Sequence, residues 1–225
     1  MLLQNITNIL RRINDAEQKF NRVSGSVNVL AVSKGQTVAD IEAAFAAGVY
    51  CFGENYVQEA LPKIEVLKDK PIEWHFIGAI QSNKTALIAR HFSWVQSVST
   101  LAIAKRLSAQ RPVELSPLNL CLQVNISGEP GKSGASVETV LDLARHVACL
   151  PNLRLRGLMA IPKVSHDVNE QREQFHRVAE LYQKIVQDKL PLDTLSMGMS
   201  GDFESAIAEG ATLVRVGTAI FGARW

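Results

Sequence analysis

The sequence contains little cysteine, and its cysteines form no recognisable motif. Only three are present among the 225 residues, so they are odd in number, and they are widely spaced. The absence of a CxxC pair or a zinc-finger spacing argues against a disulfide-stapled secreted domain and against a cysteine-based zinc module. We therefore expect Cys51, Cys121 and Cys149 to be buried, reduced thiols in a cytoplasmic protein.

An excess of charge of one sign is also absent. The chain has 24 basic residues against 22 acidic ones, a formal net charge of +2, and no basic cluster stands out along it. This balance provides no electrostatic reason to expect nucleic acid or an anionic membrane as a partner. No run reaches the roughly 18 apolar residues of a membrane span, and the N-terminus lacks the pattern of a signal peptide. The sequence therefore favours a cytoplasmic location.

Metal-binding and nucleotide-binding motifs are missing as well. The histidines show no HxxxH or HxH spacing, so the sequence predicts no metal site. They are His75, His91, His146, His166 and His176. The segment Gly131-Lys132-Ser133 resembles the end of a phosphate-binding P-loop, but that motif requires glycine at the position of Ile126. A solvated loop is the better interpretation of this segment.

Strand-like and helix-like segments alternate along most of the chain. Apolar runs typical of buried parallel strands cover residues 27–33, 50–54, 72–78, 94–98, 118–125, 153–161, 194–199 and 213–221. Stretches with helical periodicity cover residues 37–48, 56–68, 83–92, 100–110, 136–148, 169–187 and 202–210. Eight strands with seven helices between them predict an α/β fold, a single (β/α)8 TIM barrel. An open doubly wound sheet of six or seven strands is the alternative, and the number of strands favours the barrel.

One further helix precedes the predicted barrel. Apolar residues recur at helical spacing over the first 13 positions, namely Leu2, Ile6, Ile9, Leu10 and Ile13. This pattern predicts an extra N-terminal helix packed on the outside of the domain. A helix on a membrane surface is the alternative, but the polar face is not strongly basic. No linker or low-complexity tract divides the chain, so we expect residues 1–225 to form a single domain.

Lys34 is the first candidate functional residue. Functional groups of a (β/α)8 barrel lie at the carboxyl ends of its strands, and Lys34 ends the first predicted strand. It alternates with Leu30 and Val32, so it shares an otherwise apolar face. Desolvation on such a face favours the neutral amine, which is the form that attacks an aldehyde. The alternative is a lysine that leaves the barrel mouth and extends its ammonium group into water.

Arg215 provides a second cation in the same region. It lies in the eighth predicted strand, which borders the first strand in a closed barrel. Arg215 and Lys34 would therefore come from neighbouring strands and would attract an anionic ligand. The alternative is that Arg215 pairs with a carboxylate of the barrel.

Two turns rich in small residues follow the last two strands. Residues 196–202 read SMGMSGD and lead into a helix, with Ser200 near its start, and Gly217-Thr218 follows the eighth strand. Small residues allow a ligand to approach the backbone, and phosphate sites of these barrels often form after strands seven and eight. Ordinary helix capping by Ser200 or Asp202 is the alternative.

Other strands carry further candidates near their ends. Asn55 follows the second predicted strand, His75 lies in the third, Asn125 ends the fifth and Met159 lies in the sixth. Taken singly, each is better explained as a core or rim residue than as part of a ligand site.

Seven segments together resemble one family, the pyridoxal phosphate homeostasis proteins. They are residues 31–34, 52–59, 74–78, 81–84, 157–162, 196–200 and 214–222, which read AVSK, FGENYVQE, WHFIG, QSNK, GLMAIP, SMGMS and VRVGTAIFG. The match runs in order over nearly the whole chain. Two departures occur. Gly35-Gln36-Thr37 stands where family members often have Thr-Lys-Pro, and Ala79-Ile80 replaces a common Pro-Leu. The first departure removes a second lysine close to Lys34.

The resemblance implies a barrel similar to the N-terminal domain of alanine racemase, with pyridoxal 5′-phosphate (PLP) held as a Schiff base on Lys34. It further implies that the phosphate lies near Ser200 and Gly217-Thr218, and that Arg215 faces the pyridine nitrogen. The expected cofactor contacts are Lys34, Asn55, His75, Met159, Ser200, Arg215, Gly217 and Thr218. The implied role is PLP homeostasis and amino- and keto-acid balance, with no established reaction and with PLP-dependent apoenzymes as partners.

The choice between carrier and enzyme depends on what surrounds the cofactor. A carboxylate at the ring nitrogen strengthens PLP as an electron sink, whereas an arginine weakens it. Alanine racemase takes a catalytic tyrosine from a second domain across a dimer, and none of Tyr50, Tyr56 and Tyr182 lies in a matching motif. We therefore expect a monomeric carrier or regulator with no catalytic residues. An amino-acid racemase or other single-domain PLP enzyme is the alternative, and a barrel for another phosphate compound is a third.

Overall fold

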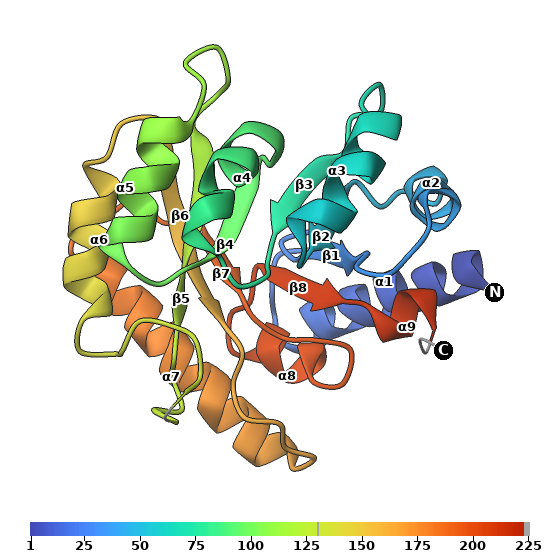
Figure 1. Ribbon diagram of the computed structural model, residues 1–225. Helices are drawn as coiled ribbons and strands as arrows, with labels where there is room; N and C mark the ends of the chain where they lie inside the picture. The colour runs from blue at the N-terminus through green and yellow to red at the C-terminus, as the bar shows by residue number, and fades with distance from the viewer. Residues whose placement is uncertain (130, 223–225) are drawn as a thin grey trace.

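A computed structural model describes residues 1–129 and 131–222 (Figure 1). Within them, eight parallel strands close into a barrel, and each strand pairs with the next along the chain. The last strand pairs with the first, so no sheet edge is left open. The strands are β1 Asn28–Val32, β2 Cys51–Glu54, β3 Glu73–Phe76, β4 Trp94–Val98, β5 Leu118–Val124, β6 Leu153–Ala160, β7 Thr194–Ser196 and β8 Leu213–Val216. This closure confirms the predicted (β/α)8 barrel and excludes the open doubly wound sheet.

Helices surround the barrel and pack on the outer faces of the strands (Figure 1). They are α1 Leu2–Lys19, α2 Val38–Ala46, α3 Val57–Val66, α4 Thr85–His91, α5 Leu101–Gln110, α6 Val140–Ala148, α7 Val168–Gln187, α8 Phe203–Ala208 and α9 Thr218–Phe221, with a 3₁₀ turn at Ser82–Lys84. Apolar side chains between the strands and the helices form the main core. None of the helices within the described ranges combines the length and the apolarity needed to cross a membrane.

The extra N-terminal helix is confirmed as α1. Ile6, Ile9 and Ile13 are buried where α1 packs on α8 and α9, whereas Leu10 is exposed, contrary to the predicted apolar stripe. The Asn5 side-chain amide donates a hydrogen bond to the Ile220 carbonyl oxygen, which ties α1 to α9. The apolar face of α1 is therefore covered by protein and not by a membrane surface.

The predicted last strand is too long. The sequence pattern indicated one strand over residues 213–221, but β8 ends at Val216 and residues 218–221 form α9. Gly217 has φ −113° and ψ −79°, which turns the chain out of the extended conformation. Apolar residues continue past the turn because α9 packs against α1, so the pattern of hydrophobicity alone does not reveal where the strand ends.

The seventh strand is also shorter than predicted, because it ends at Ser196 and not at residue 199. Gly198 has φ +91°, a conformation that side-chain-bearing residues rarely adopt. A Cβ at this position would lie 2.6 Å from the Cβ of Ala206 in α8. A glycine is therefore required where the chain turns from β7 toward α8.

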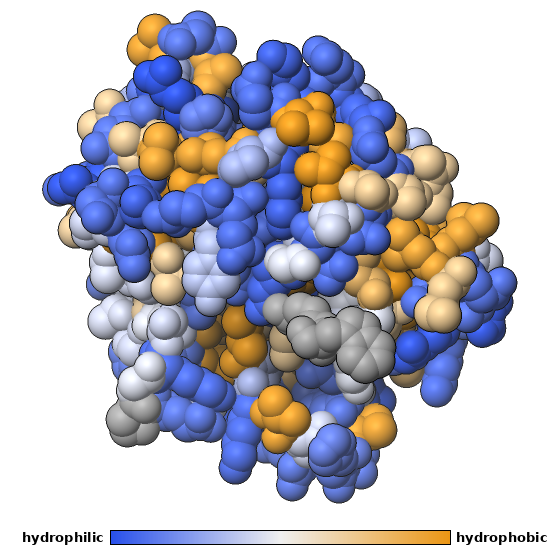
Figure 2. Space-filling model, turned by 45° about the vertical axis from the view of Figure 1, so that its right-hand side comes forward, coloured by the Kyte–Doolittle hydropathy of each residue, from blue (hydrophilic) through white to orange (hydrophobic). Residues whose placement is uncertain are grey.

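The burial of the cysteines differs in part from the prediction. All three thiols are free, as predicted, but Cys149 is exposed and Cys51 is half-buried, so only Cys121 is fully buried. On the face in Figure 2, hydrophobic residues lie in small groups among hydrophilic ones. Scattered exposed apolar side chains of this kind are common on protein surfaces.

Candidate functional site

Lys34 lies at the carboxyl end of the barrel, in the turn between β1 and α2, and it is half-buried. The turn is short because Thr37 begins the next helix. Its hydroxyl accepts a hydrogen bond from the Asp40 amide, and the Asp40 carboxylate accepts one from the Thr37 amide. The paired register of β1 and β8 aligns Leu30 with Arg215. The predicted adjacency of the first and eighth strands is therefore confirmed, although Lys34 lies in the turn after β1 and not in the strand itself.

A buried ion pair fixes the backbone next to Lys34. Lys63 Nζ, from α3, lies 2.9 Å from Glu54 Oε1 and donates a second bond of 3.0 Å to the Ser33 carbonyl oxygen. The Ser33 hydroxyl donates to the same carboxylate oxygen at 2.7 Å. Glu54 is fully buried and Lys63 nearly so. This cluster joins the ends of β1 and β2 to α3 and restrains the residue that precedes Lys34.

Arg215 is buried inside the barrel, and its guanidinium group faces neutral partners. Nη1 donates to Ser196 Oγ at 2.8 Å, and Nη2 donates to the Ala160 carbonyl oxygen at 2.9 Å. Burial lowers the pKa of Arg215 to about 10, against a smaller opposing effect of Asp202. Arg215 therefore stays protonated at neutral pH. None of the carboxylates in the described ranges pairs with it, which removes the barrel-carboxylate alternative.

A chain of hydrogen bonds crosses the barrel interior from Arg215. Ser196 Oγ donates to Gln96 Oε1 at 2.6 Å, and Gln96 Nε2 lies 2.8 Å from His75 Nδ1. His75 Nε2 lies 3.0 Å from the Glu73 carboxylate near the opposite end of the barrel. Sequence reasoning missed Gln96, and it assigned Ser196 to the turn after the seventh strand and not to the barrel interior. The available signal for Gln96 was a polar residue in the otherwise apolar run of β4.

The turns after β7 and β8 meet at the same end as Lys34. Ser200 Oγ accepts hydrogen bonds from Thr218 Oγ1 at 3.3 Å and from the Ala219 amide at 3.4 Å. A Cβ on Gly217 would lie 3.4 Å from the Cβ of Val32, two residues before Lys34. Both turns that the sequence singled out therefore lie at the barrel end that also carries Lys34.

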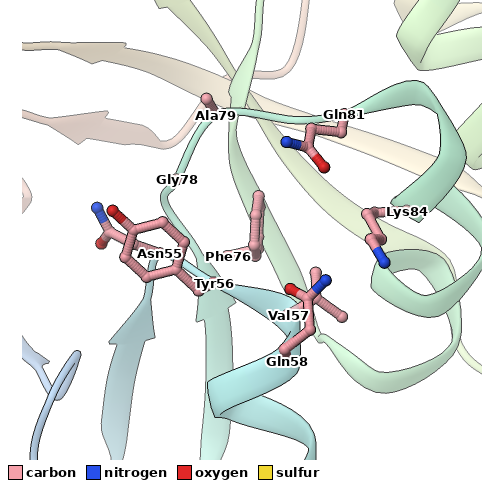
Figure 3. Close-up of a pocket in the computed structure, with 9 residues that line it drawn as sticks. All are labelled: Asn55, Tyr56, Val57, Gln58, Phe76, Gly78, Ala79, Gln81 and Lys84. Carbon is pink, nitrogen blue, oxygen red and sulfur yellow. The ribbon is translucent and has the colours of Figure 1, made fainter.

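Asn55 borders a neighbouring opening, shown in Figure 3. It directly follows β2, and its Oδ1 atom is buried without a hydrogen-bond partner. The opening has a volume of about 380 Å³, and Figure 3 shows Tyr56 on the side of Asn55 with Gln81 and Lys84 opposite. A Cβ on Gly78 would lie 2.0 Å from the Asn55 carbonyl oxygen, so only glycine allows this close approach.

His75 and Met159 lie inside the barrel and not in the loops around Lys34. The His75 ring stacks on Trp94, with ring centroids 5.1 Å apart, and burial lowers its pKa. Met159 packs with Trp94 and Cys121. Asn125 stabilises its own loop, because its side-chain amide donates to the Glu129 carbonyl oxygen. His75 lines a separate opening that Lys34 does not border.

Comparison with known proteins identifies the family. The model of the alanine racemase N-terminal domain matches residues 5–224. A protein of Pseudomonas aeruginosa named pyridoxal phosphate homeostasis protein is 55% identical over 223 residues, which covers 99% of this chain and 96% of that protein. The chain belongs to the pyridoxal phosphate homeostasis family. A relative of the same name in Escherichia coli is 45% identical over 226 residues, covering 99% of this chain and 97% of the relative.

Solved structures agree with this family assignment. The structure of PipY from Synechococcus elongatus with PLP bound matches with a TM-score of 0.81 and 35% identity, covering 93% of this chain and all of that one (100%). Alanine racemase from Corynebacterium glutamicum matches with a TM-score of 0.74 at 16% identity, covering 99% of this chain and 62% of the racemase. The second likeness establishes the shared barrel fold alone.

The residues of this family member fit PLP in two respects. Arg215 offers a buried cation without a carboxylate, which suits a neutral acceptor such as a ring nitrogen. Ser200 and Thr218 offer hydroxyl groups, and the Ala219 amide offers a donor, in turns of the kind that bind phosphate. The chemistry of this donor set therefore matches the two polar ends of the cofactor.

Proposed function

We propose that the chain holds PLP as a Schiff base on Lys34 and serves intracellular PLP homeostasis by storing the cofactor and transferring it to PLP-dependent apoenzymes. The observation that carries the proposal is that Lys34 and the joined Ser200 and Gly217-Thr218 turns occupy the same barrel end, with Arg215 on the neighbouring strand. The name and sequence identity of the relatives support the same role. We expect it to act as a monomer in the cytoplasm.

Each residue has a distinct role in this proposal. Lys34 would hold PLP through its amine, the group that attacks an aldehyde, with one water molecule released. Ser200, Thr218 and the backbone of Gly217 bind the phosphate group. Asn55 lies at the rim, where its unpartnered amide oxygen can accept a hydrogen bond. Interior residues His75 and Met159 act by supporting the wall beneath the ring.

Arg215 bears on the question of catalysis. When bound, PLP supplies an electron sink that stabilises a carbanion at the α-carbon of an amino acid. Arg215, which is protonated at neutral pH, would place a cation at the ring nitrogen and disfavour protonation of that nitrogen, which would weaken the sink. The environment of Arg215 therefore favours a carrier or regulator over an enzyme.

Borohydride reduction followed by peptide mass spectrometry tests the attachment. We expect one pyridoxyl group per chain, on Lys34, and no label in Lys34→Ala. The matched control is Lys84→Ala, which removes a lysine from the neighbouring opening and leaves the label in place. A label on any other lysine, or no label after incubation with PLP, would refute the site.

Deuterium exchange separates the carrier from an amino-acid racemase or another PLP enzyme. The PLP-loaded protein is incubated with single amino acids in D₂O, and α-proton exchange is followed by NMR. We expect exchange no faster than with free PLP. Rapid exchange or racemisation that disappears in Lys34→Ala would contradict the carrier role and establish an enzyme.

A further inference from the structure

A second cavity opens at the amino-terminal end of the barrel, opposite Lys34. It has a volume of about 450 Å³, and neither Lys34 nor the Ser200 and Gly217 turns line it. Its wall includes the first residues of six strands, namely Asn28, Cys51, Glu73, Trp94, Thr194 and Leu213. Of the residues assigned to the cofactor above, only His75, which supports the barrel wall, also lines this cavity.

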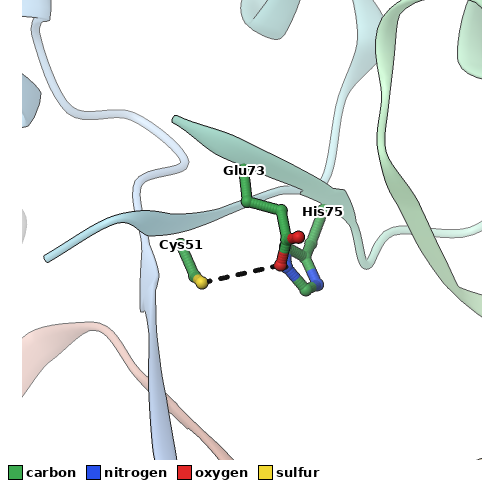
Figure 4. A group of neighbouring side chains, drawn as sticks. All are labelled: Cys51, Glu73 and His75. Atoms are coloured by element: carbon green, nitrogen blue, oxygen red, sulfur yellow. Dashed lines mark hydrogen bonds and ion pairs between the residues drawn. The ribbon is translucent and has the colours of Figure 1, made fainter. Parts of the chain in front are cut away.

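Three side chains with metal-binding atoms converge in this cavity, as Figure 4 shows. The β2–β3 register places Cys51 beside Glu73. Glu73 and His75 are two residues apart on β3, so their side chains lie on the same, inner face of the strand. Cys51 Sγ lies 3.7 Å from Glu73 Oε1, and His75 Nε2 lies 3.0 Å from the same oxygen. The three atoms all lie within 4.8 Å of one another.

These separations are close to those of a tetrahedral zinc site. With zinc bond lengths of about 2.0–2.3 Å, ligand atoms lie about 3.3 Å apart for nitrogen and oxygen and about 3.6 Å apart when one is sulfur. The Glu73–His75 and Cys51–Glu73 distances differ from these values by a few tenths of an ångström. Thiolate, imidazole and carboxylate are also the three ligand types that zinc prefers in proteins.

Trp94 provides an independent indication of an absent ligand. Its indole Nε1 atom is buried and has no hydrogen-bond partner, although Trp94 lines the same cavity. Trp94 and Glu73 line the same cavity, so the indole N–H is an unused donor beside the three side chains. A carboxylate with one oxygen on a metal presents its other oxygen to such a donor.

We propose that Cys51, Glu73 and His75 bind one divalent transition-metal ion of the zinc type at the amino-terminal end of the barrel. Water from the cavity completes the tetrahedron, and the Trp94 indole N–H binds the second oxygen of Glu73. The site would join the starts of β2 and β3.

Two changes accompany binding in this proposal. The metal replaces the Cys51 thiol proton, which leaves to solvent, so a thiolate–metal bond forms as the S–H bond breaks. His75 binds through Nε2, so its ring proton moves to Nδ1 and the Gln96 amide must turn to present its oxygen. The turn of the Gln96 amide would also change the hydrogen bonds of the chain that links His75 to Arg215.

Titration of the metal-free full-length chain with Zn²⁺ and Co²⁺ tests the site. We expect one ion per chain by calorimetry and a thiolate-to-cobalt charge-transfer band by absorption. Cys51→Ser should remove the band and weaken zinc binding by more than about 100-fold, since even loss of an outer-shell partner costs about 10- to 100-fold. Trp94→Phe keeps an aromatic ring but removes the N–H, so it should keep the band and weaken binding about tenfold.

Cys149→Ser is the matched control, because Cys149 is an exposed thiol remote from the cavity lining. It should leave the affinity and the band unchanged. Glu73→Gln, at a half-exposed position, tests the site independently if Cys51→Ser folds poorly, and it should also weaken zinc binding. The proposal is overturned if the wild type binds no zinc, if the band survives Cys51→Ser, or if it depends on Cys149.

Nitrogen-15 NMR of the histidine rings adds a readout that is independent of affinity. Zinc should move the His75 ring proton from Nε2 to Nδ1 and leave the ring signals of exposed His166 unchanged. Zinc binding without any change in the His75 signals would overturn the assignment of this ligand. All these measurements use the protein without PLP, so their failure is distinguishable from failure of the Lys34 proposal.

Discussion

Loss of Lys63 should destabilise the protein strongly, because it leaves the Glu54 carboxylate buried and unpaired. Glu54 is fully buried, and its only cationic partner within the described part of the chain is Lys63 at 2.9 Å. Its Oε2 atom already has no hydrogen-bond partner. Removing one member of a buried pair costs about 3–5 kcal/mol. The Ser33 carbonyl oxygen adds little, because it still accepts a bond from the Gln36 amide.

We therefore expect Lys63→Met to lower the free energy of unfolding by about 3–5 kcal/mol, a large share of the 5–15 kcal/mol typical of a domain. Glu54→Gln should cost about 1–2 kcal/mol, because the amide oxygen that replaces the carboxylate would keep the bond from Ser33 and the Lys63 ammonium can shift toward water. The critical test is the double variant. Adding Glu54→Gln to Lys63→Met removes the unpaired charge, so it should restore about 2 kcal/mol.

Urea unfolding at pH 7, followed by circular dichroism, provides the measurement. The protein must be free of PLP, because a ligand that binds only the folded state would mask the differences. PLP affinity is a second readout, since Ser33 is held by this cluster and precedes Lys34. If Glu54→Gln destabilises the Lys63→Met background further, the uncompensated charge does not explain the loss, and the reasoning fails.

Three further outcomes are expected. Gly157→Ala should lower the free energy of unfolding by at least about 3 kcal/mol, because its Cβ would lie 1.6 Å from the Thr194 carbonyl oxygen. Gly201→Ala is the control, and it should change the free energy of unfolding by about 0.5 kcal/mol or less, because no atom lies within 4 Å of its Cβ. Equal urea midpoints for the two variants would contradict this expectation. At pH 8 a disulfide reagent should modify Cys149 fast and the other thiols slowly, because burial raises the pKa of Cys51 and Cys121 to about 12; two or more fast equivalents in the native protein would refute it. Ser200→Ala should weaken PLP binding about tenfold by removing a phosphate hydroxyl, measured by fluorescence titration, and an unchanged Kd would exclude Ser200 from the phosphate site.

The sequence predicted the presence of each strand better than the residue at which the strand ends. Periodicity revealed eight strands because a parallel strand covered by helices is apolar on both faces. The same signal overextended the last two strands, since Met197 and Ile220 are buried outside the sheet. The backbone at Gly198 and Gly217, and not hydrophobicity, ends those strands.

The fold class and the chemistry available at the barrel mouth follow from the linear pattern of residues. The strand and helix periods imply a closed barrel, and the barrel rule brings Lys34, Ser200 and Thr218 to one end because parallel strands share their carboxyl edge. Tertiary structure alone decided which polar groups meet inside. Strand register and rotamers join Arg215, Ser196, Gln96 and His75 into one chain, although these residues lie far apart in sequence. The pairing of Cys51 with Glu73 is likewise invisible to linear spacing, because it depends on a hydrogen-bonded register between two strands 22 positions apart.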